Sequence, residues 1–295
     1  MLSIAQNASN LFCIEWIPTE LGPQAVKYKK VQLSSDSQFK NFLDDVLVHF
    51  KSESDNSPKT LTLSLDIENV AITSFYCDPE IPVDEYISWY EKRILGEYIV
   101  QNYDIYYYPL GLVENLVMVF YISKTKRQNI LKSCNKNSYQ ILHLTLDIFS
   151  ANYASKIYGS SKCKNYIIWK ISNNNYHYLI NIQNGELKHY MKFKKTTKIE
   201  CIQFVGEQNF QSKLEKLCHS LLFKSRGNID IVDKVFLYQT KSESTLIKKL
   251  VNKNKKIVLM DIKNNLLDKK SNHKNANYSL LCYNENGNSL RGIDV

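Results

Sequence analysis

The chain has 295 residues, of which 44% are hydrophobic and 23% are charged, so it is long enough to form a globular protein with two lobes. Its 9 glycines and 6 prolines exclude collagen-like and proline-rich architectures. Seven scattered cysteines, none in a C-x-x-C pair, argue against a disulfide framework and a zinc site, and the net charge of +9 is unevenly distributed along the chain.

The first 60 residues predict two strands and a helix. Residues 11–17 (LFCIEWI) and 25–33 (AVKYKKVQL) are predicted strands joined by a Pro- and Gly-containing hairpin connection. Residues 39–50 place their apolar side chains on one helical stripe. The chain shows no basic leader followed by an apolar stretch and no run of about 18 apolar residues, so we expect neither a signal peptide nor a transmembrane helix.

The middle of the chain alternates strands with amphipathic helices. The predicted order is strand 61–76, helix 83–95 after Pro82, strands 103–110 and 115–123, helix 123–136 and strand 138–146. Asp147 follows the last of these strands directly. A polar stretch, residues 156–164, is predicted to be a hinge between two lobes.

The remaining residues repeat a similar plan. Strands are predicted at 165–171, 176–182 and 184–193, and the last two are separated by the hairpin dipeptide Asn184-Gly185. A helix at 210–225, a strand at 233–239, a helix at 244–253 and a strand at 256–262 follow. Strand hairpins followed by helix and strand in both halves are what a duplicated fold would give.

This order of elements resembles the PilM family of type IV pilus assembly proteins and, more distantly, the GspL-like cytoplasmic domain of type II secretion. The resemblance includes the helix with Pro82, Glu85 and Trp89, the segment Asp147-Ile148-Phe149-Ser150-Ala151, and the ending Leu290-Arg291-Gly292. It implies an α/β, actin-like ATPase fold with two ribonuclease-H-like lobes and a small α+β subdomain inserted in the first. The implied boundaries are 1–60 and 124–157 for the first lobe, 61–123 for the inserted subdomain and 158–295 for the second lobe.

The nucleotide loops implied by the resemblance are degenerate. An actin-like site holds phosphates with glycine-bearing hairpins and positions magnesium with acidic residues. The resemblance assigns the corresponding positions to Glu15, Ile17, Asp147, Lys170, Ser172 and Gln239. A lysine at an acidic position opposes a cation, and the expected glycines are absent. We therefore expect no enzyme activity and no ATP or magnesium cofactor, and the alternative is that Lys170 contacts phosphate in an active ATP-binding protein.

The function implied by the resemblance is that of a non-catalytic scaffold. It would lie in the cytoplasm, peripheral to the inner membrane, and bind the N-terminal peptide of a PilN-like single-pass membrane protein in a groove between the first lobe and the insertion. Contact with the pilus motor ATPase is a second implied interaction. Tyr86, Trp89 and Tyr90 are the predicted partner-binding aromatics, with Trp89 as a core anchor and both tyrosines exposed.

Two other interpretations follow from the residues alone. Residues 241–274 contain ten lysines and three acidic residues, which fits a solvated face, an anionic membrane or nucleic acid. Glu15, Asp66 and Asp147 could form a two-metal nuclease site, but the implied boundaries place Asp66 in the insertion, away from the other two. The six histidines show no ligand spacing, so we expect no metal site. With the scaffold as the leading interpretation, we also expect no nucleic-acid partner.

Overall fold

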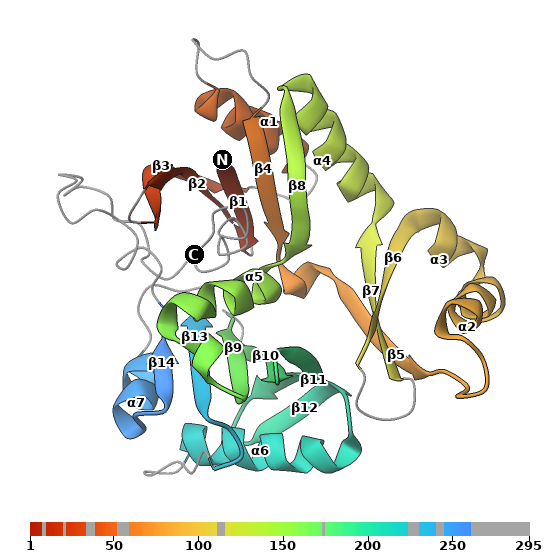
Figure 1. Ribbon diagram of the computed structural model, residues 1–295, viewed down its shortest axis with the longest axis vertical. Coiled ribbons are helices and arrows are strands. Elements are labelled where there is room, and N and C mark those ends of the chain that lie inside the picture. Colours follow the sequence, from red (N-terminus) through yellow and green to blue (C-terminus); the bar gives the residue numbers. More distant parts are fainter. Residues whose placement is uncertain are drawn as a thin grey trace.

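The computed structural model (Figure 1) describes residues 1–295 except 8–9, 20–21, 34–38, 52–58, 111–115, 173–174, 224–229, 240–244 and 261–295. Among the described residues, no helix is long and apolar enough to cross a membrane. The chain forms two sheets of similar topology that face each other, with a smaller sheet beside the first.

The first sheet has the strand order β3-β2-β1-β4-β8. Its strands are β1 (Leu2–Asn7), β2 (Asn10–Thr19), β3 (Gly22–Gln32), β4 (Lys59–Leu65) and β8 (Tyr139–Leu146). The first three pair in antiparallel fashion, whereas β4 runs parallel to both β1 and β8. Helices α1 (Phe39–Phe50) and α4 (Lys124–Lys136) pack together beside this sheet, because each buries an apolar stripe.

The insertion is a three-stranded antiparallel sheet with the order β5-β7-β6. It comprises β5 (Ala71–Tyr76), β6 (Tyr103–Pro109), β7 (Leu116–Ser123), α2 (Val83–Tyr90), the π-helical η3 (Glu91–Leu95) and α3 (Gly96–Asn102). The helical segment covers one face of the sheet, where Val117, Val119 and Tyr121 form a separate core with it. This subdomain stands to the right of both lobes in Figure 1.

The second sheet has the order β12-β11-β10-β9-β13-β14. Its elements are β9 (Asn165–Ile171), β10 (Tyr176–Gln183), β11 (Glu186–Lys195), β12 (Ile199–Val205), α6 (Gln208–Phe223), β13 (Lys234–Gln239), α7 (Thr245–Lys253) and β14 (Ile257–Leu259). An antiparallel meander is followed by two strands parallel to β9, so this sheet repeats the order of the first and adds β12 at its edge. Asn184 and Gly185 both adopt positive φ in the β10–β11 turn, as the hairpin dipeptide predicts.

A short helix, α5 (Asp147–Ala154), lies between the two sheets (Figure 1), followed by the 3-10 turns η4 (Ser155–Tyr158) and η5 (Ser160–Lys162) in the predicted hinge. One continuous apolar core joins Leu63 of β4 and Ala151 of α5 to Ile168 and Ile180 on the facing side of the second sheet. The opposite side of the second sheet packs on α6 and α7 through a separate core. The described parts of the two lobes are therefore in apolar contact.

Two sequence predictions about the elements are wrong. The strand predicted over residues 61–76 is two strands in different sheets, because the carboxylate of Asp66 accepts a hydrogen bond from Glu68 N and starts the 3-10 turn η2 (Ile67–Asn69). Since β4 belongs to the first sheet, the insertion begins after it and not at residue 61. The first strand, β1, was not predicted: every residue of LSIAQN is buried, so the strand shows no alternation of apolar and polar positions.

Candidate functional site

The candidate site lies where the carboxyl ends of strands from both lobes meet. Asp66 directly follows β4, and Asp147 directly follows β8 and begins α5. Lys170 is near the carboxyl end of β9, the central strand of the opposite lobe. The carboxyl ends of parallel strands are where open α/β sheets bind ligands. This is therefore the place at which an actin-like protein would hold a nucleotide.

The Lys170 side chain fills this place. Its Nζ is 2.7 Å from Asp66 Oδ1 and 2.5 Å from Asp147 Oδ2, and all three side chains are fully buried. Glu68 Oε1 is 3.8 Å from the same nitrogen and also accepts a hydrogen bond from Ser172 Oγ. We call Lys170, Asp66, Asp147 and Glu68 the interlobe ion cluster.

Backbone N–H groups also donate hydrogen bonds to the two aspartates. Asp147 Oδ1 accepts hydrogen bonds from Ile67 N at 3.0 Å and from Ile148 N at 2.9 Å. Asp66 Oδ1 accepts one from Glu68 N at 2.9 Å in addition to that from Lys170. Buried charges are tolerated when they are both paired and hydrogen-bonded in this way.

The electrostatics keep the cluster ionic. Burial alone would lower the pKa of Lys170, but the carboxylates of Asp147, Asp66 and Glu68 outweigh it and hold that pKa well above its usual value. Burial, with a smaller contribution from the charge of Asp66, raises the pKa of Asp147 to about 6 against the opposing effect of Lys170. Lys170 therefore remains protonated at neutral pH.

The sequence predictions for this site are partly wrong. The structure brings Asp147, Lys170 and Ser172 together, and it adds Asp66, which was expected to lie apart in the insertion. Asp66 joins them because β4 and β8 are neighbouring parallel strands whose ends share one edge. Glu68 was not predicted, and the only signal for it in the sequence is its place three residues after the end of a buried strand.

Glu15 and Ile17 lie outside the site. Since β1 is the first strand, the hairpin next to the cluster is β1–β2, and Glu15 pairs with Leu2 at the opposite end of β1. Glu15 Oε1 is 3.3 Å from Lys59 Nζ, and Ile17 is 41% exposed. Gln239 ends β13 opposite Ile171, so its backbone is at the same edge of the sheet as the cluster.

A magnesium–nucleotide pair does not fit these residues. A divalent cation would have to lie near the carboxylates of Asp66 and Asp147, and the Lys170 ammonium already occupies the space between them. Within the described part of the chain, no group of three His, Cys, Asp or Glu side chains is arranged to hold a metal ion. The carboxylates of Asp66 and Asp147 are already paired with the Lys170 ammonium, so they are not available as metal ligands.

A groove at the junction of the first lobe and the insertion is a second feature. It has a volume of about 410 Å³, and its lining residues come from α1, β4, the β4–β5 connection, β7 and α4: Phe39, Leu65, Asn69, Val70, Ile122, Ser123, Thr125, Lys126 and Asn129. Phe39, Leu65 and Ile122 give it a buried apolar floor. Asn69 and Thr125 are exposed at its rim.

The predicted partner-binding aromatics are placed differently. Tyr90 stacks on Phe75 with ring centroids 4.1 Å apart, and Tyr86 stacks on the same ring at 5.8 Å, so both tyrosines belong to the small core of the insertion. Trp89, the predicted core anchor, is 47% exposed. None of the three lines the groove.

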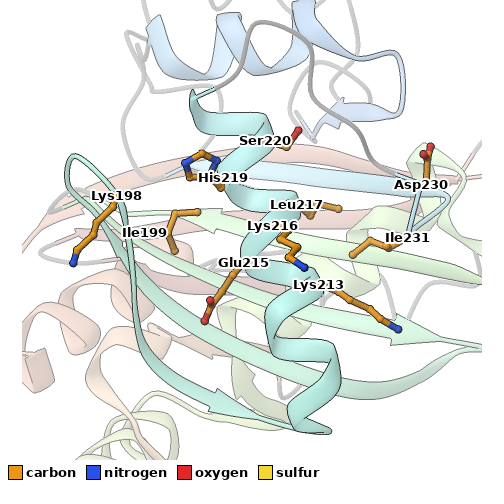
Figure 2. Close-up of a pocket in the computed structure, with 10 residues that line it drawn as sticks. All are labelled: Lys198, Ile199, Lys213, Glu215, Lys216, Leu217, His219, Ser220, Asp230 and Ile231. Carbon is orange, nitrogen blue, oxygen red and sulfur yellow. The ribbon is translucent and has the colours of Figure 1, made fainter.

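Another pocket, of about 570 Å³, lies around α6 in the second lobe. Figure 2 shows that its charged side chains diverge: Lys198 and Lys213 point to opposite sides, and Glu215 points away from His219. Because these groups do not converge on one point, this pocket offers no chemical site.

Comparison with known proteins agrees with the topology. The fold is of the actin-like class, with two sheets of the same strand order and an insertion in the first lobe. It is similar to the PilM–PilN type IV pilus biogenesis complex, with a TM-score of 0.59, 11% identity, and coverage of 99% of this chain and 98% of the other. No protein-family model matches the sequence, and neither does any curated protein.

Two further structures show weaker similarity. A Bacteroides thetaiotaomicron protein with an actin-like ATPase fold has a TM-score of 0.46 and 15% identity, with 90% of this chain and 91% of the other covered. The cytoplasmic domain of EpsL, an inner-membrane component of the Vibrio cholerae type II secretion system, has a TM-score of 0.42 and 9% identity, with 85% and 93% covered.

Proposed function

We propose that this protein is a non-catalytic scaffold of a type IV pilus or related secretion assembly, and that its groove binds the N-terminal cytoplasmic peptide of a PilN-like single-pass membrane protein. The groove between α1, α4 and the insertion carries the proposal. It is supported by the similarity in fold, over almost the whole chain, to a protein solved in complex with PilN.

The shape and chemistry of the groove suit a short extended peptide. Its floor is apolar, so one or two peptide side chains can be buried against Phe39 and Ile122. Asn69, Thr125 and Asn129 at its sides can hydrogen-bond to a peptide backbone. Each buried apolar side chain contributes about 1.5–3 kcal/mol, less the cost of ordering the peptide, which predicts micromolar affinity.

The interlobe ion cluster supports the non-catalytic part of the proposal. A protein whose nucleotide position is filled by its own lysine has no place for ATP chemistry there. The scaffold would lie in the cytoplasm at the inner membrane, held there by its partner, and would also contact the motor ATPase of the machine.

The test is to fill the groove and measure peptide binding. In N129W, an indole replaces a side chain that lines the groove, whereas in the control Q128W the indole projects from the neighbouring exposed position of α4. We expect N129W to bind a fluorescent PilN-like N-terminal peptide at least tenfold more weakly in polarisation titrations, and Q128W to bind as the unmodified protein does. Equal binding by N129W and Q128W would place the peptide elsewhere.

A further inference from the structure

We propose that the Lys170 ammonium is a built-in cation that takes the place of a metal–nucleotide pair and fixes the two lobes in one closed arrangement. The inference goes beyond the scaffold function, because it concerns how the lobes are held in position and not what they bind.

The first argument is the origin of the groups. Asp66 and Asp147 come from the ends of two neighbouring strands in the first lobe, and Lys170 comes from the central strand of the second. Neither lobe alone can neutralise its own buried charge. The three groups are satisfied together only when the second sheet lies where one nitrogen is 2.7 Å from one carboxylate and 2.5 Å from the other. An ionic contact of this kind specifies one geometry, whereas apolar contacts tolerate several.

The second argument is that further polar contacts across the same boundary require the same arrangement. Ser172 of the second lobe donates to Glu68 in the connection that leads to the insertion. Gln203 Nε2 of β12 donates to the carbonyl of Ile72 in β5 at 2.5 Å. The Tyr166 hydroxyl of β9 donates to Asn152 Oδ1 of α5 at 3.1 Å. Each of these contacts joins the second lobe to the first lobe or the insertion, so a rotation of the lobes that broke the ion cluster would strain them too.

The third argument is the position of the ammonium. In open α/β sheets, ligands bind at the carboxyl ends of the parallel strands, and an anionic ligand such as a nucleotide needs a cation beside acidic residues. Lys170 supplies a single positive charge at that position, covalently attached, and it cannot dissociate. A structure closed in this way does not depend on nucleotide concentration.

The experiment is hydrogen–deuterium exchange of the full chain with mass-spectrometric readout. K170A should accelerate exchange in peptides covering residues 66–70 and 147–154 at least tenfold, while peptides of α6, far from the boundary, stay unchanged. Propylammonium contains the atoms that the truncation removes and should slow exchange again, whereas tetramethylammonium, with the same charge but no N–H group, should not. The matched control is K192A, which removes a lysine from the same face of the second sheet, where it lies over the Tyr178 ring at 5.4 Å.

Several outcomes would overturn the inference. If both boundary peptides exchange at the same rate in K170A as in the unmodified protein, the lysine does not hold the lobes together. If the boundary peptides of the unmodified protein exchange more slowly when magnesium and ATP are added, a nucleotide still binds between the lobes and holds them closed. If K170A does not fold, the neutral triple variant K170M/D66N/D147N decides: it should fold and exchange faster at the boundary only, and unchanged exchange there would refute the proposal.

Discussion

Replacing Lys170 with methionine should destabilise the protein in a pH-dependent way. The substitution shortens the side chain by one atom and removes its charge, leaving the carboxylates of Asp66 and Asp147 fully buried without their shared cation. Removing one partner of a buried ion pair typically costs about 3–5 kcal/mol, because the remaining charge is uncompensated. That is a large fraction of the roughly 5–15 kcal/mol by which a folded domain is stable.

The sign of the pH dependence follows from the pKa of the carboxylates. The pKa of Asp147 is already raised to about 6 by burial, and removal of Lys170 removes the main effect that lowers it. A carboxyl with a raised pKa in the folded state stabilises the fold when protonated, and this stabilisation is lost as the pH rises through that pKa. The free energy of unfolding of K170M should therefore fall more steeply with increasing pH than that of the unmodified protein.

Urea unfolding followed by tryptophan fluorescence measures this effect, because Trp16 and Trp169 are buried in different lobes and report on both. The difference between K170M and the unmodified protein should be about 3–5 kcal/mol near pH 8 and smaller near pH 5. K192M is the control and should cost less than about 1 kcal/mol, because this lysine is only half-buried. A difference below about 1 kcal/mol near pH 8, or one that grows as the pH falls, would refute the reasoning.

Three further outcomes are expected. Calorimetry with ATP and magnesium should show no saturable heat at millimolar ligand. A micromolar dissociation constant would contradict the interpretation that Lys170 fills the nucleotide position. Co-sedimentation with anionic vesicles should be weak and should disappear near 1 M salt, where the screening length is about 3 Å. Binding that resists salt would require apolar side chains that enter the lipid. Burial lowers the pKa of His177 to about 3 and that of His189 to about 4, so stability should fall as the pH drops below about 6.5, by up to about 1.4 kcal/mol per unit for each histidine. H177Q should remove part of this slope in urea titrations, and an unchanged slope would exclude His177 as a cause.

The sequence was most informative where local patterns decide the structure. The hairpin of β10 and β11 was predicted because the Asn184-Gly185 dipeptide fixes the turn, and the helix at 39–50 because its apolar residues share one stripe. In the insertion, Tyr86 and Tyr90 are four residues apart and therefore share one face of α2, which contacts Phe75. That spacing is visible in the sequence, but the size and hydrophobicity of Trp89 favour it as the core residue there, and the structure exposes it.

The rest depends on contacts between distant residues. Lys170 and Asp66 are 104 positions apart, and only the parallel pairing of β4 with β8 brings Asp66 and Asp147 to the same edge. Because the sequence pattern does not reveal β1, it assigns the first hairpin to Glu15, which pairs with Leu2 at the end of β1 away from the ion cluster. The groove also combines residues from four elements, and no local pattern reveals such a combination.

The interlobe ion cluster makes its residues interdependent under substitution. An acidic residue in place of Lys170 would bring a further carboxylate against Asp66 and Asp147, in a region from which water is excluded. Glycine or alanine at this position would leave two buried negative charges facing each other. Any single substitution that removes the Lys170 charge therefore destabilises the protein, and a neutral residue at position 170 is tolerated only when the aspartates change with it.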